Sequence, residues 1–177
     1  MPDPTFEALV ERYSSEIYTY LWRLLRDPEL ASDVLQDTFL RAWRAFPRLK
    51  HHDHLRAWLY TIATNRARTL QKARARRESG LTGVSDELAD PRASVAAQAA
   101  NRDLRRRVLA AVDRLPARQR QALVLRRYQE LGYDEIAAIM GGSREAARTN
   151  VHLAQERLRQ WLSDVDEGQA SGRRGKR

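Results

Sequence analysis

Apolar side chains recur every three or four residues along most of this 177-residue chain, and this spacing decides which folds it can adopt. It places an apolar stripe on each of a series of helices, and no segment alternates apolar and polar residues as a half-buried strand does. One stripe lies within residues 6–25. A second, within residues 31–46, follows the helix start signal Asp27-Pro28. The chain is therefore predicted to be all-α.

A segment without apolar periodicity divides the chain into two parts. Residues 78–92 contain two glycines, three Ser or Thr and one proline, which indicates a flexible linker, assigned to residues 78–101. The prediction is thus two small helical domains, residues 1–77 and 102–162, on a tether. The polar, glycine-rich residues 163–177 are predicted to be disordered.

Composition excludes several classes of protein. The chain has no cysteine, which rules out disulfides and cysteine-ligated metal sites. No run of eighteen apolar residues is present, so no membrane-spanning helix and no membrane partner are expected. The N-terminus lacks a basic segment before an apolar stretch, so no secretory signal is predicted and a cytoplasmic location is expected.

The net charge of +9 is distributed unevenly. Residues 38–77 and 102–127 are strongly basic, whereas residues 1–37 are acidic. Two basic blocks favour a polyanionic partner, and the acidic block suggests a separate surface for a protein partner. The alternative is that these runs are solvated helix faces and that the abundant arginine reflects a GC-rich genome.

Residues 135–143 read as the first helix and turn of a helix-turn-helix. Ala138 is small where two helices would cross, Gly141 can end the first helix in a left-handed conformation, and Ser143 can cap the next. The outward positions of that next helix would enter a major groove, where Arg148 could reach a guanine edge. The alternative is an ordinary helical hairpin.

Aromatic residues lie among arginines in the first domain, at Trp43, Phe46, Trp58 and Tyr60. Such a pattern can form a stacking platform for single-stranded bases. Trp43 and Trp58 fall on apolar stripes, which favours a place in the core, whereas Tyr60 lies off the stripe, which favours the surface. The amide of Asn65, where the apolar stripe ends, could read a base edge.

Four potential metal ligands stand in a row at residues 51–54, His-His-Asp-His. Consecutive residues converge poorly on one ion, and no second ligand group stands at helical spacing from them. No metal or cofactor is therefore expected. No catalytic constellation is recognisable either, which predicts that the protein is not an enzyme.

Three ordered motifs resemble the extracytoplasmic-function group of bacterial RNA polymerase sigma factors. Asp33–Arg44 is similar to that family's core-polymerase-binding helix, and Arg56–Asn65 to its promoter-melting segment. Leu115–Leu125, followed by Tyr133–Met140, resembles its fourth conserved region. The resemblance covers about residues 6–76 and 102–162.

The resemblance implies an alternative sigma factor that binds core RNA polymerase, through its largest and second-largest subunits, and directs promoter-specific initiation. It implies base capture at the minus-ten element, duplex reading at the minus-thirty-five element, and an anti-sigma factor as a further partner. The core-binding residues would be Asp33, Gln36, Asp37 and Phe39. The minus-ten residues would be Leu49, Lys50, His51, His52, Tyr60, Asn65 and Arg66. The minus-thirty-five residues would be Arg126, Tyr133, Asp134, Arg144, Arg148, Thr149 and His152.

The recognition helix departs from the family pattern. Asn150, Leu153 and Gln155 stand where basic residues are common, and Glu145 replaces a frequent glycine. An unusual minus-thirty-five sequence is therefore one alternative. A stand-alone helix-turn-helix regulator is another, although such a protein would not need the motifs of the first domain.

Overall fold

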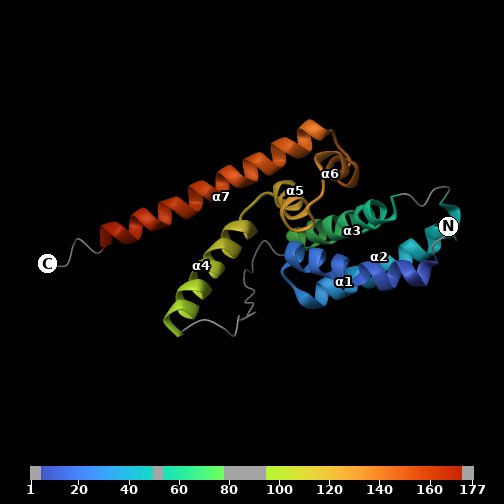
Figure 1. Ribbon diagram of the computed structural model, residues 1–177, viewed down its shortest axis with the longest axis horizontal. Helices are drawn as coiled ribbons and strands as arrows, with labels where there is room; N and C mark the ends of the chain where they lie inside the picture. The colour runs from blue at the N-terminus through green and yellow to red at the C-terminus, as the bar shows by residue number, and fades with distance from the viewer. Residues whose placement is uncertain (1–4, 50–53, 78–94, 173–177) are drawn as a thin grey trace.

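The computed structural model describes residues 5–49, 54–77 and 95–172, and every regular element within these ranges is a helix (Figure 1). This confirms the all-α prediction. The N-terminal part contains α1 (Phe6–Leu25), α2 (Pro28–Ala45), the short 3₁₀ helix η1 (Phe46–Arg48) and α3 (Leu55–Arg77). The C-terminal part contains α4 (Val95–Asp113), α5 (Ala117–Tyr128), α6 (Tyr133–Met140) and α7 (Arg144–Gly172).

Local signals explain the first two helix boundaries. The Thr5 hydroxyl accepts a hydrogen bond from the Ala8 N–H and caps α1, which ends where Arg26 adopts a φ of 57°. The Asp27 carboxylate then accepts from the Leu30 N–H at 3.0 Å, with Pro28 in the first turn of α2. These are the ordinary start signals of a helix. Pro47 has no N–H to continue α2, and the chain tightens into η1.

The N-terminal domain is a three-helix unit in which α1, α2 and α3 pack on one another. Its core contains two tyrosines, Tyr20 and Tyr60, whose rings meet edge to face at 5.1 Å between centroids. Buried hydroxyls need partners: Tyr20 shares a 2.8 Å hydrogen bond with Thr64, and Tyr60 donates to Glu16 at 2.7 Å. These bonds tie α1 to α3.

The C-terminal domain packs α4, α5 and α6 against α7. Gly141 ends α6 at a φ of 63°, and the Ser143 hydroxyl accepts from the Ala146 N–H at the start of α7. Both features of the predicted helix-turn-helix are therefore confirmed. The expectation for Ala138 is wrong, because its side chain is exposed; the small buried residues at this crossing are Ala137 and Ala147.

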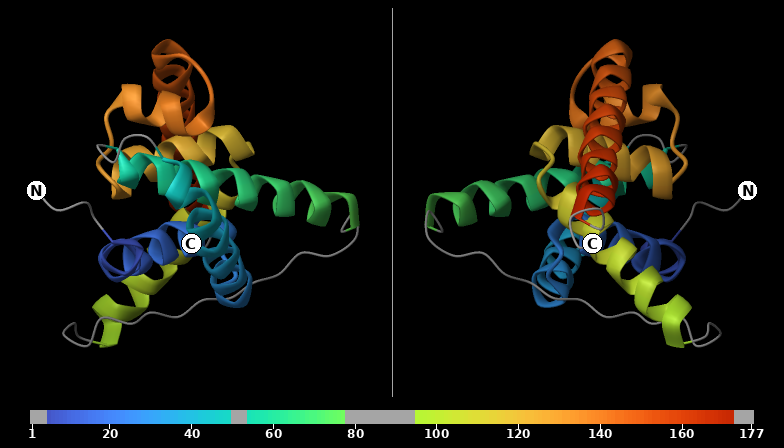
Figure 2. Two further views of the ribbon diagram at one scale, coloured as in Figure 1. Left: turned by 90° about the vertical axis from the view of Figure 1, so that its right-hand side faces the viewer. Right: turned by 90° about the vertical axis from the view of Figure 1, so that its left-hand side faces the viewer.

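The two domains are packed against each other. α3 contacts α6, and α1 contacts α5, so that the C-terminal domain meets the three-helix domain through α5 and α6, which lie above α3 in Figure 2. A continuous buried cluster extends from Tyr20 and Leu59 in the first domain to Leu125 and Ile136 in the second. The sequence predicted two domains joined only by a tether, because apolar periodicity cannot show which stripes of different domains pack together.

Two predicted boundaries also differ from the structure. The linker prediction reached residue 101, but α4 begins at Val95. Disorder was predicted from residue 163, but α7 continues to Gly172 and runs away from the three-helix domain (Figure 1). Neither segment has an apolar stripe at helical spacing, because residues 95–101 are mostly alanine and residues 163–172 are mostly polar. Within the described residues, no helix is long and apolar enough to cross a membrane.

Candidate functional site

The outward face of α2 is the first candidate surface. Asp33, Gln36, Leu40 and Trp43 follow the three- and four-residue spacing of one helix face, and all four are exposed. Leu40 is 46% and Trp43 59% exposed. An apolar pair this open on a helix of a small protein is typical of an interaction surface.

Two of the predicted core-binding residues make contacts within the three-helix domain. Phe39 is half-buried, with its ring edge to face against Phe6 at 6.4 Å between centroids. The Asp37 carboxylate accepts from Arg41 at 2.9 Å and forms an ion pair with Arg66 of α3. Phe39 and Asp37 therefore hold α2 in place, whereas Asp33 and Gln36 remain open.

The sequence analysis missed Leu40 and misplaced Trp43, which was predicted to be buried. The apolar stripe of α2 is wide, and its buried line consists of Ala31, Val34, Thr38 and Ala42. Trp43 lies beside this line rather than on it. Leu40 and Trp43 share the spacing of Asp33 and Gln36, which is the signal that could have identified them.

The second candidate surface lies on α3. Asn65 is exposed, and its side-chain oxygen accepts from Arg68 at 3.3 Å. Arg66 is engaged with Asp37, and Leu49 is half-buried against the core. Lys50, His51 and His52 lie outside the described residues. Among the residues that the structure describes, no three His, Asp or Glu side chains converge as a metal site.

The prediction that Tyr60 lies on this surface is wrong. Its side chain is fully buried, and its hydroxyl donates to Glu16. Burial and the hydrogen bond to Glu16 raise the pKa of Tyr60 above its ordinary value of 10.0. The pattern failed here because α3 is covered on more than one side, so a residue off the main stripe is still enclosed. Trp58, predicted to be core, is partly buried against it.

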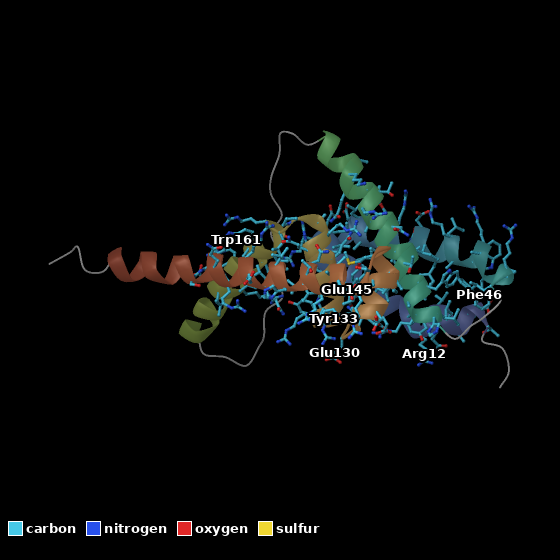
Figure 3. All side chains as sticks on the ribbon, turned by 90° about the horizontal axis from the view of Figure 1, so that it is seen from above. Arg12, Phe46, Glu130, Tyr133, Glu145 and Trp161 are labelled. Carbon is cyan, nitrogen blue, oxygen red and sulfur yellow. The ribbon has the colours of Figure 1, made fainter. Side chains whose placement is uncertain are left out.

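The third candidate surface is the start of α7. Arg144, Arg148, Thr149 and His152 are all exposed, on successive turns of the helix. Arg144 lies 3.8 Å from Asp134 of α6, and His152 lies 3.5 Å from Glu156. Glu145 lies in the first turn of α7, with Arg144. In Figure 3, Glu145 and Tyr133 lie near the junction with the three-helix domain, and Phe46 lies at the other end of that domain. Four of the seven residues predicted to read the minus-thirty-five element therefore lie on α7, whereas Tyr133 and Asp134 lie on α6 and Arg126 lies on α5.

Two other residues predicted to contact the minus-thirty-five element, Arg126 and Tyr133, make contacts within the protein. Arg126 donates to the Leu131 carbonyl at 2.9 Å, and its guanidinium lies over the Tyr133 ring at 4.9 Å. This arrangement fixes the segment between α5 and α6. Arg118, which the sequence analysis did not single out, donates to the Met140 carbonyl at 3.1 Å and so holds the end of α6. Only the tertiary contact identifies that role.

Comparison with known proteins assigns the chain to a family. Residues 9–77 match the family model described as Sigma-70 region 2, and residues 105–158 match Sigma-70, region 4. The chain belongs to the extracytoplasmic-function group of the sigma-70 family of RNA polymerase sigma factors. It is an alternative sigma factor, the class of subunit that binds core RNA polymerase and directs transcription initiation.

Particular relatives cover nearly the whole chain. RNA polymerase sigma factor CarQ of Myxococcus xanthus is 34% identical over 161 residues, which is 91% of each protein. RNA polymerase sigma factor YlaC of Bacillus subtilis is 32% identical over 88% of this chain and 90% of its own length.

The fold is also similar to solved structures. The sigma factor RpoE of Bartonella quintana, in complex with the anti-sigma factor NepR, superposes with a TM-score of 0.72 at 24% identity, over 89% of this chain and 96% of its own. CnrH, in complex with the cytosolic domain of CnrY, gives a TM-score of 0.66 at 25% identity, over 90% of this chain and 88% of its own.

Proposed function

We propose that the outward face of α2, consisting of Asp33, Gln36, Leu40 and Trp43, is the surface that binds core RNA polymerase. The observation that carries this proposal is the exposure of Leu40 and Trp43 beside two polar residues on the helix that resembles the family's core-binding helix. Complete burial of an exposed large apolar side chain supplies about 1.5–3 kcal/mol, and because Leu40 and Trp43 are about half exposed, each would contribute roughly half of that. Acidic Asp33 would meet a basic group of the polymerase.

The proposed minus-ten surface consists of Asn65 together with residues 49–54. Asn65 presents an amide that can donate to and accept from a flipped base, and Arg68, which donates to this amide, would contact the adjacent phosphate. In this proposal Arg66 acts through Asp37, orienting α3 against α2, rather than by touching DNA. Base capture would offset the few kcal/mol that unstacking a base requires.

The proposed minus-thirty-five surface is the start of α7. Arg148 would donate two hydrogen bonds to a guanine, and Thr149 would contact a base or phosphate beside it. Arg144 would meet the backbone, with Asp134 orienting its side chain. Because Arg126 and Tyr133 contact each other, we assign them to positioning the helix-turn-helix.

The proposed role includes no catalytic group of the chain's own, and its proposed site of action is the cytoplasm, where the polymerase works. One structural neighbour was solved with an anti-sigma factor, and we propose a partner of that class here. The acidic N-terminal helix and the open face of α2 would be available to it.

Run-off transcription with purified core polymerase and genomic DNA fragments tests this function. The expected result is a limited set of transcripts that core enzyme alone does not make. Gel filtration of the chain with core enzyme tests the interaction separately. Co-elution without new transcripts would contradict promoter recognition, and failure to co-elute would contradict the assignment of α2.

A further inference from the structure

The turn between α6 and α7 contains two consecutive glycines, Gly141 and Gly142. Both N–H groups donate to the Ala137 carbonyl, which closes the end of α6. Glycine has the widest choice of backbone conformations of any residue, so the turn by itself fixes the direction of α7 only weakly. The direction of α7 therefore depends also on contacts that come from outside the turn.

One such contact comes from the first turn of α5. The Nη2 atom of Arg118 donates to the Met140 carbonyl at 3.1 Å, and it lies 3.9 Å from the position that a Cβ would take on Gly142. A small hollow beside the guanidinium is lined by Gly142 together with Ser143, Ala146 and Asn150. Arg118 therefore lies against the turn and faces the first two turns of α7.

The next residue of α5 holds α7 at a second place. Gln119 is buried, and its side-chain oxygen accepts from Arg157 at 3.0 Å. Arg157 belongs to the fourth turn of α7, whereas the predicted reading residues Arg144 and Arg148 lie in the first two. Without the Arg118 bond, the start of α7 could pivot about the Arg157 contact. Without the Arg157 bond, the start of α7 would still be held.

Reading a base pair needs closer positioning than binding a phosphate does. The contact proposed for Arg148 requires two N–H groups to reach the O6 and N7 atoms of one guanine. A displacement of about 1 Å exceeds what such a paired contact tolerates. Contacts to phosphates position the protein but carry no sequence information. A small movement of α7 should therefore reduce base discrimination before it reduces overall affinity.

We propose that Arg118 is a positioning residue for promoter recognition: through the Met140 carbonyl it fixes the direction of α7 and so sets how well the minus-thirty-five base pairs are discriminated. This role rests on the function proposed above for α7. Arg118 itself contacts no base. Because Arg118 is exposed, a direct contact with a DNA phosphate is the alternative that the experiment separates from it.

Arg118→Met removes the donor and the charge but keeps a long side chain. Holoenzyme that contains this variant is compared with wild-type holoenzyme, by competition between promoters that differ at single base pairs of the minus-thirty-five element. The discrimination ratio at the most selective position should fall about two- to ten-fold, as for the loss of one hydrogen bond. Partial unfolding would lower the affinity for every promoter equally and would leave this ratio unchanged.

Arg157→Met is the matched control, since it removes the same charge and the second bond between α5 and α7. It should keep the wild-type discrimination ratio. Arg118→Lys, which retains a donor for the Met140 carbonyl, should restore most of the ratio that Arg118→Met loses. Equal loss of discrimination in Arg118→Met and Arg157→Met would overturn the proposal, and so would wild-type discrimination in Arg118→Met.

The salt dependence of binding separates the two roles of Arg118. A residue that neutralises a phosphate contributes about 0.9 to the slope of log affinity against log salt concentration. Arg118→Met should leave that slope unchanged. A smaller slope with intact discrimination would make Arg118 a phosphate contact and overturn the proposal. Wild-type holoenzyme that does not discriminate minus-thirty-five variants would instead overturn the function proposed for α7, and the role of Arg118 with it.

Discussion

Glu16 joins α1 to α3 and, through Arg56, is linked to the second domain. Its carboxylate accepts from Arg56 and from the buried Tyr60 hydroxyl. Tyr60 in turn packs against Tyr20. A buried polar group stabilises a fold only when it is paired, and here Arg56 and Tyr60 are both paired with Glu16. The sequence showed these residues only as members of a stripe or as a charge.

The two buried tyrosines predict how the protein responds to alkali. Burial raises the pKa of Tyr20, and burial with the Glu16 hydrogen bond raises that of Tyr60, both above the ordinary value of 10.0. A raised pKa contributes stability that is present below pH 10 and is lost as pH rises toward the folded-state value. Tyrosinate absorbance and circular dichroism should therefore change together during the late part of an alkaline titration. Tyr20→Phe should reduce that late absorbance change, whereas ionisation of all six tyrosines with helicity intact would contradict this account.

Leu40→Asp should abolish co-elution with core polymerase without unfolding the protein. Leu40 is 46% exposed, so the folded chain tolerates a charge there, whereas an apolar interface would not. Leu104→Asp is the matched control, since Leu104 is 53% exposed on α4 and lies outside the proposed interface. The measurement is gel filtration with core enzyme. Retained co-elution of the Leu40 variant would remove this residue from the interface.

Arg148→Ala should weaken promoter binding by about 1–3 kcal/mol and relax the preference at one base pair, as expected for a bidentate base contact. The control is Arg159→Ala, exposed on the same helix but three turns further along. Binding is measured by competition between promoters that differ at single base pairs of the minus-thirty-five element. An unchanged base preference would show that Arg148 contacts only phosphate or nothing.

Among the helices, the turn between α6 and α7 has the clearest local determinants. The Gly141 and Gly142 N–H groups donate to the Ala137 carbonyl, and Arg118 donates to the Met140 carbonyl. The carbonyls at the end of α6 thus receive donors, and the direction of α7 is set relative to α5. The glycine and serine signals were readable in the sequence, whereas the contribution of Arg118, from 22 residues away, was not.

Gly141→Ala should lower the free energy of unfolding by about 1 kcal/mol, because a Cβ disfavours the left-handed conformation at this position. Gly142→Ala is the control, with no positive φ and only ordinary contacts for an added Cβ, 3.9 Å from Arg118 and 4.0 Å from Ala146. Urea unfolding of the two variants gives the comparison. Equal destabilisation would show that the backbone conformation of Gly141 is not the cause.

At the level of the whole molecule, the shared core predicts that the domains unfold together. The buried cluster is continuous from α1 to α7, and a domain that loses its partner exposes part of that cluster to water. Trp161→Phe leaves tryptophans only in the first domain, so its fluorescence reports that domain, while circular dichroism reports both. The two urea transitions should coincide. Separate midpoints would mean that the domains are independent in stability.

Residue types and their spacing were sufficient for most of the helices and for the caps at Asp27, Gly141 and Ser143, whereas the class of protein followed from the resemblance of three ordered motifs to a known family. Helix formation and capping depend on neighbours within a few residues, and the three motifs keep their order along the chain. The exposure of Trp43, the burial of Tyr60 and the true crossing at Ala137 were not predicted. Each depends on how wide a stripe its neighbouring helices cover, which is a property of packing.

The same division applies to the relation between the domains. The sequence determined two helical units, one with basic and aromatic residues and one with a helix-turn-helix, because both follow from local pattern and charge. Only the tertiary structure decided that these units dock, through Arg56, Arg23 and Arg26. Those contacts join residues separated by about half the chain, and no periodicity within either segment specifies such a pairing.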